Sequence, residues 1–252
     1  NIANRSWSKP RACQIPLTLG GANTYSGVTT IKNGMLGIGV ANILPTGAAL
    51  VLGDSAAVAN AGTLNLGGFS QTIGGLTVAT LAANNATATN KIINIGAGQP
   101  LNIVTNASGN NVLGQEGTHL EVSGAGAMNI TTTNGGIYIY GRRASSSPYW
   151  GMDLSQLGYF SAAVTNILVC SGNGAQRQGL LALALTNDIT ARTFYAGFST
   201  DQGSTEALIG LGYSNALNIA NLYLGYGKAN GIMRFNGGVT GGSVTLVNPI
   251  RE

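Results

Sequence analysis

Acidic side chains are the groups in this sequence best suited to acid–base chemistry, and there are only eight of them in 252 residues. They are Asp54, Glu116, Glu121, Asp153, Asp188, Asp201, Glu206 and Glu252. The densest titratable group is His119 with Glu116 and Glu121 on either side. Glycan-cleaving hydrolases need clustered carboxylates that act as acid and base, and no Asp-Asp pair occurs here. We therefore expect these acids at outward strand and turn positions, and we expect no catalytic centre.

A basic pair beside two aromatic residues is the second candidate for chemistry. Arg142 and Arg143 precede Tyr149 and Trp150 by a few residues. Such a loop could bind an acidic sugar, supply the base of a polysaccharide lyase, or contact another subunit. The simpler interpretation is a solvent-facing loop whose long side chains lie along the surface with their charges in water.

Basic residues also crowd the first eleven positions, where Arg5, Lys9 and Arg11 surround Trp7. A basic arm can bind nucleic acid or an anionic polymer. However, twelve Lys and Arg residues and a net charge of +4 over the whole chain do not form the dense stripe of a nucleic-acid-binding protein. We expect no nucleic-acid partner, and we expect residues 1–16 to be a non-repeat arm that packs across a neighbour or caps the first coil.

The cysteines and the histidine do not predict a metal site or a disulfide. Cys13 and Cys170 are far apart in the chain, and residues several coils apart cannot reach the Cα separation of about 5.5 Å that a disulfide needs. His119 has no Cys or other His near it in sequence. We therefore predict two unbridged thiols, no metal and no cofactor. Cys170 corresponds to Gly197 and Gly225 in the repeats described next, so its position should require a small residue.

A repeat of 27 and then 28 residues sets the architecture that must position these groups. Three strand-like triplets recur at this step, at residues 167–169, 194–196 and 222–224, and the segments before them recur in the same register. A fixed step with apolar strands between Gly, Asn and Ser turns is typical of stacked supersecondary units. Each unit leaves its apolar faces open until a neighbour covers them, which describes a solenoid.

The composition agrees with an all-β solenoid. Charged residues make up 8% of the chain and Gly contributes 39 residues, against averages of about 25% and about 7%. Short alternations of apolar and polar residues indicate half-buried strands: 17–19, 64–66, 101–103, 120–122 and 128–130. At roughly 20 to 28 residues per coil, the chain would form about ten coils in a single continuous solenoid over residues 17–252. Loops are expected at 81–90 and 142–148, between one repeat type at 17–80 and another at 150–250.

Part of the chain resembles a known family. The run LTLGGANTYSGVTTI at 17–31 continues through Gly34-Met35-Leu36 and Leu44-Pro45-Thr46-Gly47 to LNLGGFSQTIGGL at 64–76. These segments resemble the passenger-associated β-strand repeat of bacterial autotransporter-type surface proteins, over about a quarter of the chain. The resemblance implies a right-handed parallel β-helix, export and a role at the bacterial surface or outside the cell, and it implies no catalytic residues.

Two hypotheses of function follow. The first is a structural extracellular protein, either a subunit of a fibre or filament assembled end to end or a section of a long surface stalk. Its partner would be another copy, and the assembly contacts would be Arg5, Trp7, Lys9, Arg11, Val244, Leu246 and Ile250. The alternative is a carbohydrate-binding or polysaccharide-degrading β-helix protein, an adhesin or lyase, whose partner would be an extracellular polysaccharide.

The chain begins without a signal segment, which suggests that one was removed or that this is a section of something longer. No stretch approaches the roughly 20 apolar residues of a membrane helix.

Overall fold

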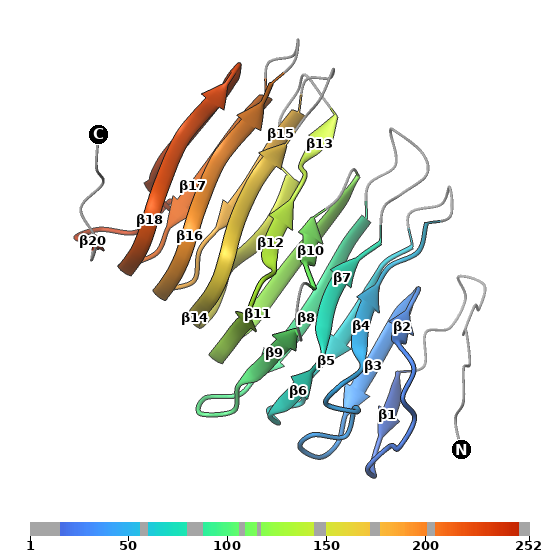
Figure 1. The fold of residues 1–252 in the computed structure, drawn as a ribbon. Helices are drawn as coiled ribbons and strands as arrows, with labels where there is room; N and C mark the ends of the chain where they lie inside the picture. The colour runs from blue at the N-terminus through green and yellow to red at the C-terminus, as the bar shows by residue number, and fades with distance from the viewer. Residues whose placement is uncertain are drawn as a thin grey trace.

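The computed structural model describes residues 16–55, 60–79, 88–105, 109–114, 117–143, 150–171, 177–200 and 205–246, with only the backbone of 142 and 143. Throughout these residues the chain forms strands joined by turns and bends, and no helix is present. Nearly all strand pairs are parallel, and they stack into an elongated β-solenoid (Figure 1). The prediction of an all-β solenoid is confirmed.

The strands form three ladders of parallel neighbours, which run along the solenoid side by side. The first ladder consists of β1 (Leu17–Leu19), β3 (Gly34–Ile38), β5 (Gly62–Asn65), β8 (Ala88–Ile95), the first parts of β11 (Thr118–Thr132) and β14 (Trp150–Ser171), β15 (Arg177–Ala182), β17 (Thr205–Leu211) and β19 (Ala229–Phe235). The second consists of β6 (Gln71–Ile73), β9 (Leu101–Thr105), the last part of β11, the middle of β14, the first parts of β16 (Thr186–Ser199) and β18 (Ser214–Gly227), and β20 (Ser243–Leu246). The third consists of β2 (Thr29–Ile31), β4 (Ala49–Leu52), β7 (Gly75–Val78), β10 (Asn111–Gly114), β12 (Gly136–Ile139) and the last parts of β14, β16 and β18.

About six turns of the solenoid have a strand in all three ladders. They begin at β5, β8, β11, β14, β15 and β17. Strands β1 to β4 and strands β19 and β20 add incomplete turns at the two ends.

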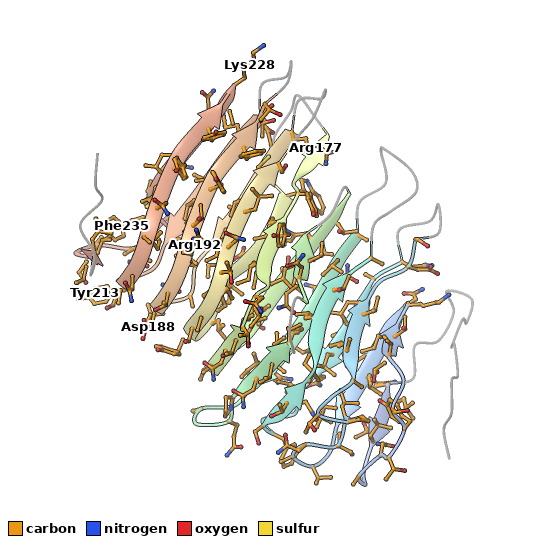
Figure 2. The ribbon with its side chains drawn as sticks, in the orientation of Figure 1. Arg177, Asp188, Arg192, Tyr213, Lys228 and Phe235 are labelled. Carbon is orange, nitrogen blue, oxygen red and sulfur yellow. The ribbon has the colours of Figure 1, made fainter. Side chains whose placement is uncertain are left out.

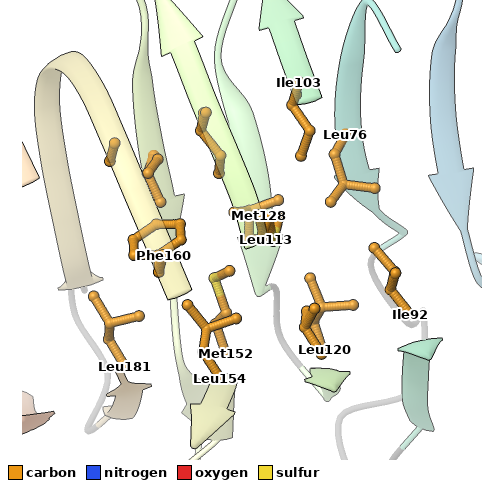
Figure 3. Close-up of a cluster of buried hydrophobic side chains, with 14 of the residues drawn as sticks. Leu76, Ile92, Ile103, Leu113, Leu120, Met128, Met152, Leu154, Phe160 and Leu181 are labelled. Carbon is orange, nitrogen blue, oxygen red and sulfur yellow. The ribbon is translucent and has the colours of Figure 1, made fainter. Parts of the chain in front are cut away.

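The core is a set of apolar rows that run along the axis. Every second residue of a strand points inward, as in β11, where Leu120, Val122, Met128 and Ile130 are buried, whereas Glu121 and Asn129 are partly exposed. Figure 3 shows such side chains from successive strands meeting in the interior. Because equivalent positions stack at about 4.8 Å per turn, each inward residue is covered by the same position of the turns before and after it.

The predicted register of the repeats is confirmed. Ile167 pairs with Phe194 and Phe194 pairs with Leu222, all in parallel strands of the third ladder. The last residues of the three triplets, Val169, Ala196 and Leu224, are paired in the same way. The step of 27 and 28 residues is therefore one turn of the solenoid.

A backbone corner explains the glycines of this repeat. Cys170, Gly197 and Gly225 occupy the same place in three successive turns and have φ angles of 60°, 87° and 84°. L-residues with a Cβ atom are disfavoured in this left-handed region, and Gly is not. The prediction that Cys170 stands at a position for small residues agrees with this geometry.

Buried amides satisfy the backbone where a turn lacks a regular strand. Gln71 accepts a hydrogen bond from Leu44 N at 3.1 Å and donates one to Leu44 O at 3.1 Å, which holds the 42–45 segment beside β6. Asn111 accepts from Leu76 N at 2.9 Å in the third ladder. In both cases the side chain takes the place of the missing ladder partner.

The two predicted loops are shorter than expected. Strand β8 begins at Ala88, inside the range 81–90, because Ala88 and Asn90 point inward and are buried. Arg142 and Arg143, at the start of the second range, form β13, which pairs antiparallel with β15. The remainder of both ranges lies outside the described residues.

Candidate functional site

The C-terminal end of the solenoid is the most distinctive surface of the described chain. Three strand segments form it: the last part of β18, β19 and β20 (Figure 1). Within the described ranges, each continues its ladder on one side only, with β16, β17 and β18 respectively. The other edge of each segment therefore presents backbone N–H and C=O groups that have no ladder partner there.

The inward side chains of these last strands have lost their cover. In the third ladder Val169 and Ala196 are buried, whereas Leu224, the next member of their row, is 50% exposed. In the second ladder Leu217 is buried, whereas its partner Leu246 is 48% exposed. The apolar rows continue to the last described turn, and no described strand lies beyond it to bury these side chains.

The first ladder ends in the same way. Leu211 is buried, and its partner Phe235 is 38% exposed. Figure 2 shows Phe235 at this end of the molecule. We name the following set the C-terminal face: Leu222, Leu224, Met233, Phe235, Val244 and Leu246.

The structure thus places two of the proposed assembly residues, Val244 and Leu246, on the C-terminal face. Ile250 and the arm residues Arg5, Trp7, Lys9 and Arg11 lie outside the described residues. The sequence analysis missed the other four members of the face. A usable signal was present for Leu222 and Leu224, because they belong to the last of the three repeated triplets.

The opposite end of the described solenoid is formed by β1 and β2. In the described ranges β1 pairs only with β3, and β2 only with β4. Leu17 is 40% exposed, whereas its partner Leu36 is buried. We name β1 and β2 the N-terminal face.

An aromatic cluster lies on the side of the solenoid next to the C-terminal face. Tyr195 stacks on Tyr223 with ring centroids 4.8 Å apart, and Phe198 stacks on Tyr226 at 5.1 Å. The two pairs contact each other edge to face at 5.1 to 5.6 Å. Burial raises the pKa of Tyr195, and the neighbouring Tyr223 and Tyr226 add to the effect. Thr193, two residues before Tyr195 in β16, points to the same outward side of the sheet.

His119 lies in a polar group that the fold assembles from distant segments. Its Nδ1 accepts a hydrogen bond from Gly151 N at 3.1 Å, so this nitrogen carries no proton. Burial lowers the pKa of His119, although Asp153 and Glu121 oppose the shift. The ring also meets Trp150 edge to face, with centroids 5.5 Å apart.

The acids near His119 already have partners. Glu121 and Asp153 are directly paired residues of adjacent strands, which the sequence analysis did not anticipate because they lie on different turns. Glu121 forms a salt bridge of 2.6 Å with Lys91, and Asp153 accepts a hydrogen bond from Ser155 N at 2.8 Å. Glu116 lies outside the described residues. The two carboxylates therefore lie side by side on adjacent strands, and each already has a partner.

The proposed glycan loop is only partly described. Arg142 pairs with Gln178 and Arg143 with Arg177 through the backbone of β13 and β15. The side chains of the two arginines and all of Tyr149 lie outside the described residues. Trp150 is half-buried at the start of β14 and packs against His119.

Cys170 is a buried free thiol, and burial raises its pKa to about 12. The thiolate is the reactive form of cysteine, so this side chain is chemically inert at neutral pH. Cys13 lies outside the described residues.

Among the described side chains, no three His, Cys, Asp or Glu residues gather where they could hold a metal ion. A search of the same residues for long apolar helices that could cross a membrane found none. Comparison of the chain with protein-family models, with curated proteins and with solved structures gave no match.

Proposed function

We propose that this chain is a structural β-solenoid protein of the bacterial surface or exterior, a subunit of a fibre or filament assembled end to end or a section of a long stalk. The repeat resemblance of residues 17–76 suggests a right-handed coil and an autotransporter-type passenger. We propose about ten coils in all, of which about six are complete in the described residues.

The observation that carries this proposal is the exposure of the C-terminal face. Leu224, Phe235 and Leu246 are 38% to 50% exposed, whereas their paired residues in the preceding turn are buried. Unpaired strand edges are a template for further strands, and natural proteins normally cover them. Terminal units of a solenoid normally carry a polar outer face, and the C-terminal face is apolar instead. A surface of this kind is suited to being covered by another layer of the same type.

Light scattering as a function of protein concentration tests the proposal. The wild-type chain is expected to gain mass with concentration and to form filaments visible by electron microscopy. Leu246→Lys should remain monomeric, because a charge would then be buried between two layers. It should still fold, since Leu246 is half exposed and the Lys stem can cover Leu217.

The matched control is Thr190→Lys, which adds the same charge to an exposed outward position of β16. This variant should assemble like the wild type. A wild-type chain that stays monomeric at high concentration, with a β-sheet circular dichroism spectrum, would overturn the proposal of end-to-end assembly. Equal loss of assembly in both variants would show that charge alone, and not the C-terminal face, controls it.

The aromatic cluster supports carbohydrate binding as a second candidate function. Tyr223 and Tyr226 are exposed, and the flanking Thr193 and Asn221 are uncharged hydrogen-bonding residues of paired strands. Aromatic rings beside neutral polar groups suit an uncharged sugar better than an acidic one. Titration with neutral oligosaccharides, followed by tyrosine fluorescence, should give a saturable change that Tyr223→Ala abolishes. An unchanged signal would remove this candidate.

A further inference from the structure

We infer that the partner of the C-terminal face is the N-terminal face of a second copy, in the register that continues the existing rows, so that Phe235 of one copy lies over Leu17 of the next. This inference rests on the proposed end-to-end assembly and specifies its contact. It concerns which residues meet, and it can fail while the assembly itself stands.

One apolar row reaches both faces of the first ladder. From the N-terminal face the paired residues are Leu17, Leu36, Leu64, Ile92 and Val122. The row continues through Leu154, Leu183 and Leu211, which are buried. Each of them directly follows a paired residue, namely Asp153, Ala182 and Gly210 in that order. It ends at Phe235, the partner of Leu211. Its two terminal members, Leu17 and Phe235, are 40% and 38% exposed, and the residues between them are buried.

The third ladder ends one turn before the first ladder in the described residues. It begins with the pairs of Thr29 with Leu50 and of Ile31 with Leu52. It ends with Leu222 and Leu224 on β18. When β1 of the next copy pairs with β19, β2 of that copy therefore lies two turns beyond the last part of β18 and does not pair with Leu222 or Leu224. The register of the contact is thus set by the first ladder, in which Phe235 meets Leu17.

A head-to-tail contact fits these strands better than a contact between two C-terminal faces. The strand pairs at both ends of the solenoid are parallel, and parallel pairs hydrogen-bond in a different pattern from antiparallel pairs. Two identical faces related by a twofold axis would close at a dimer, whereas the head-to-tail contact repeats without closing.

Disulfide trapping tests the register. The double variant Leu17→Cys/Phe235→Cys is made with Cys13→Ser, and Cys170 stays because its thiol is buried. Paired Cα atoms of neighbouring strands lie within the separation of about 5.5 Å that a disulfide needs. Leu17 lies in β1, at one end of the solenoid (Figure 1), and Phe235 lies at the other end (Figure 2), so a bond between them joins two copies. Mild oxidation should give a ladder of linked multimers on a non-reducing gel.

The matched control is Leu17→Cys/Ile232→Cys. Ile232 is about as exposed as Phe235 on the same strand but pairs with Leu208, outside the row of Leu17. We expect at least about tenfold less cross-linking in this control. Equal cross-linking of both pairs, or a dimer from Phe235→Cys alone, would overturn the register. If light scattering still shows assembly in that case, the proposed function stands and only this inference fails. If light scattering shows no assembly, both fail.

Discussion

Truncation of two residues in one row offers a direct measure of how open the C-terminal face is. Phe194 and Leu222 are paired neighbours, and Phe194 is fully buried between Ile167 and Leu222. Phe194→Ala removes most of a large side chain from a covered layer, and such changes cost about 3–5 kcal/mol of unfolding free energy. Leu222 is packed against the core on one side only. Its truncation should therefore cost half of the 2–5 kcal/mol typical of a buried Leu, or about 1–2.5 kcal/mol.

The assay is chemical denaturation followed by far-ultraviolet circular dichroism, at a protein concentration below the onset of assembly. Thr193→Ala, at the outward position beside Phe194, is the control and should change stability by less than about 0.5 kcal/mol. At concentrations that favour assembly, the cost of Leu222→Ala should rise toward that of a buried Leu, because association stabilises only the folded chain. If Leu222→Ala costs the dilute monomer as much as Phe194→Ala, the C-terminal face is covered and the reasoning is refuted.

Three further predictions concern single positions. Gly197→Ala should lower the unfolding free energy by at least about 1 kcal/mol, because φ is +87° and a Cβ atom would lie 2.6 Å from the carbonyl oxygen of Asn230; a neutral result in denaturant titration would contradict the strained corner. Since burial lowers the pKa of His119 below its usual 6.5, the unfolded chain binds the proton more readily, and stability should be fully present above pH 6.5 and decline as the pH falls below it. His119→Gln should remove this decline when the free energy of unfolding is measured between pH 7.5 and 5.5, about one unit on either side of the ordinary His pKa of about 6.5. If the stability of this variant still falls with pH as in the wild type, the decline does not come from His119. Glu121→Gln and Asp153→Asn should leave the behaviour of the protein toward glycans unchanged; cleavage of any glycan that disappears in either variant would establish an enzyme instead.

The sequence by itself determined the class of fold and the register of its second half. Alternation such as Leu120-Glu121-Val122 is a local property of a strand, since successive side chains point to opposite faces. The step that links Ile167, Phe194 and Leu222 is also a property of the chain alone, because equal spacing returns the chain to the same place after each turn. Gly197 and Gly225 mark one corner for the same reason.

Only the tertiary structure decided the register of the middle of the chain, where turns differ in length. Gly151 and His119 are neighbours 32 residues apart, whereas the amides of Asn187 and Asn215 meet at a separation of 28. A repeat of 27 or 28 residues therefore could not place Glu121 beside Asp153, nor Trp150 against His119. The pairing of Arg142 and Arg143 with β15 depends equally on the course of the chain between them.

The C-terminal face, too, was decided by tertiary structure. The sequence does not distinguish the position of Leu224 from those of Val169 and Ala196, because all three occupy the same place in the repeat. Their local sequence gives each the same inward position, but burial depends on a layer contributed by another turn. Leu224 is exposed because no described strand lies beyond it, and the proposed assembly surface rests on that difference between equivalent positions.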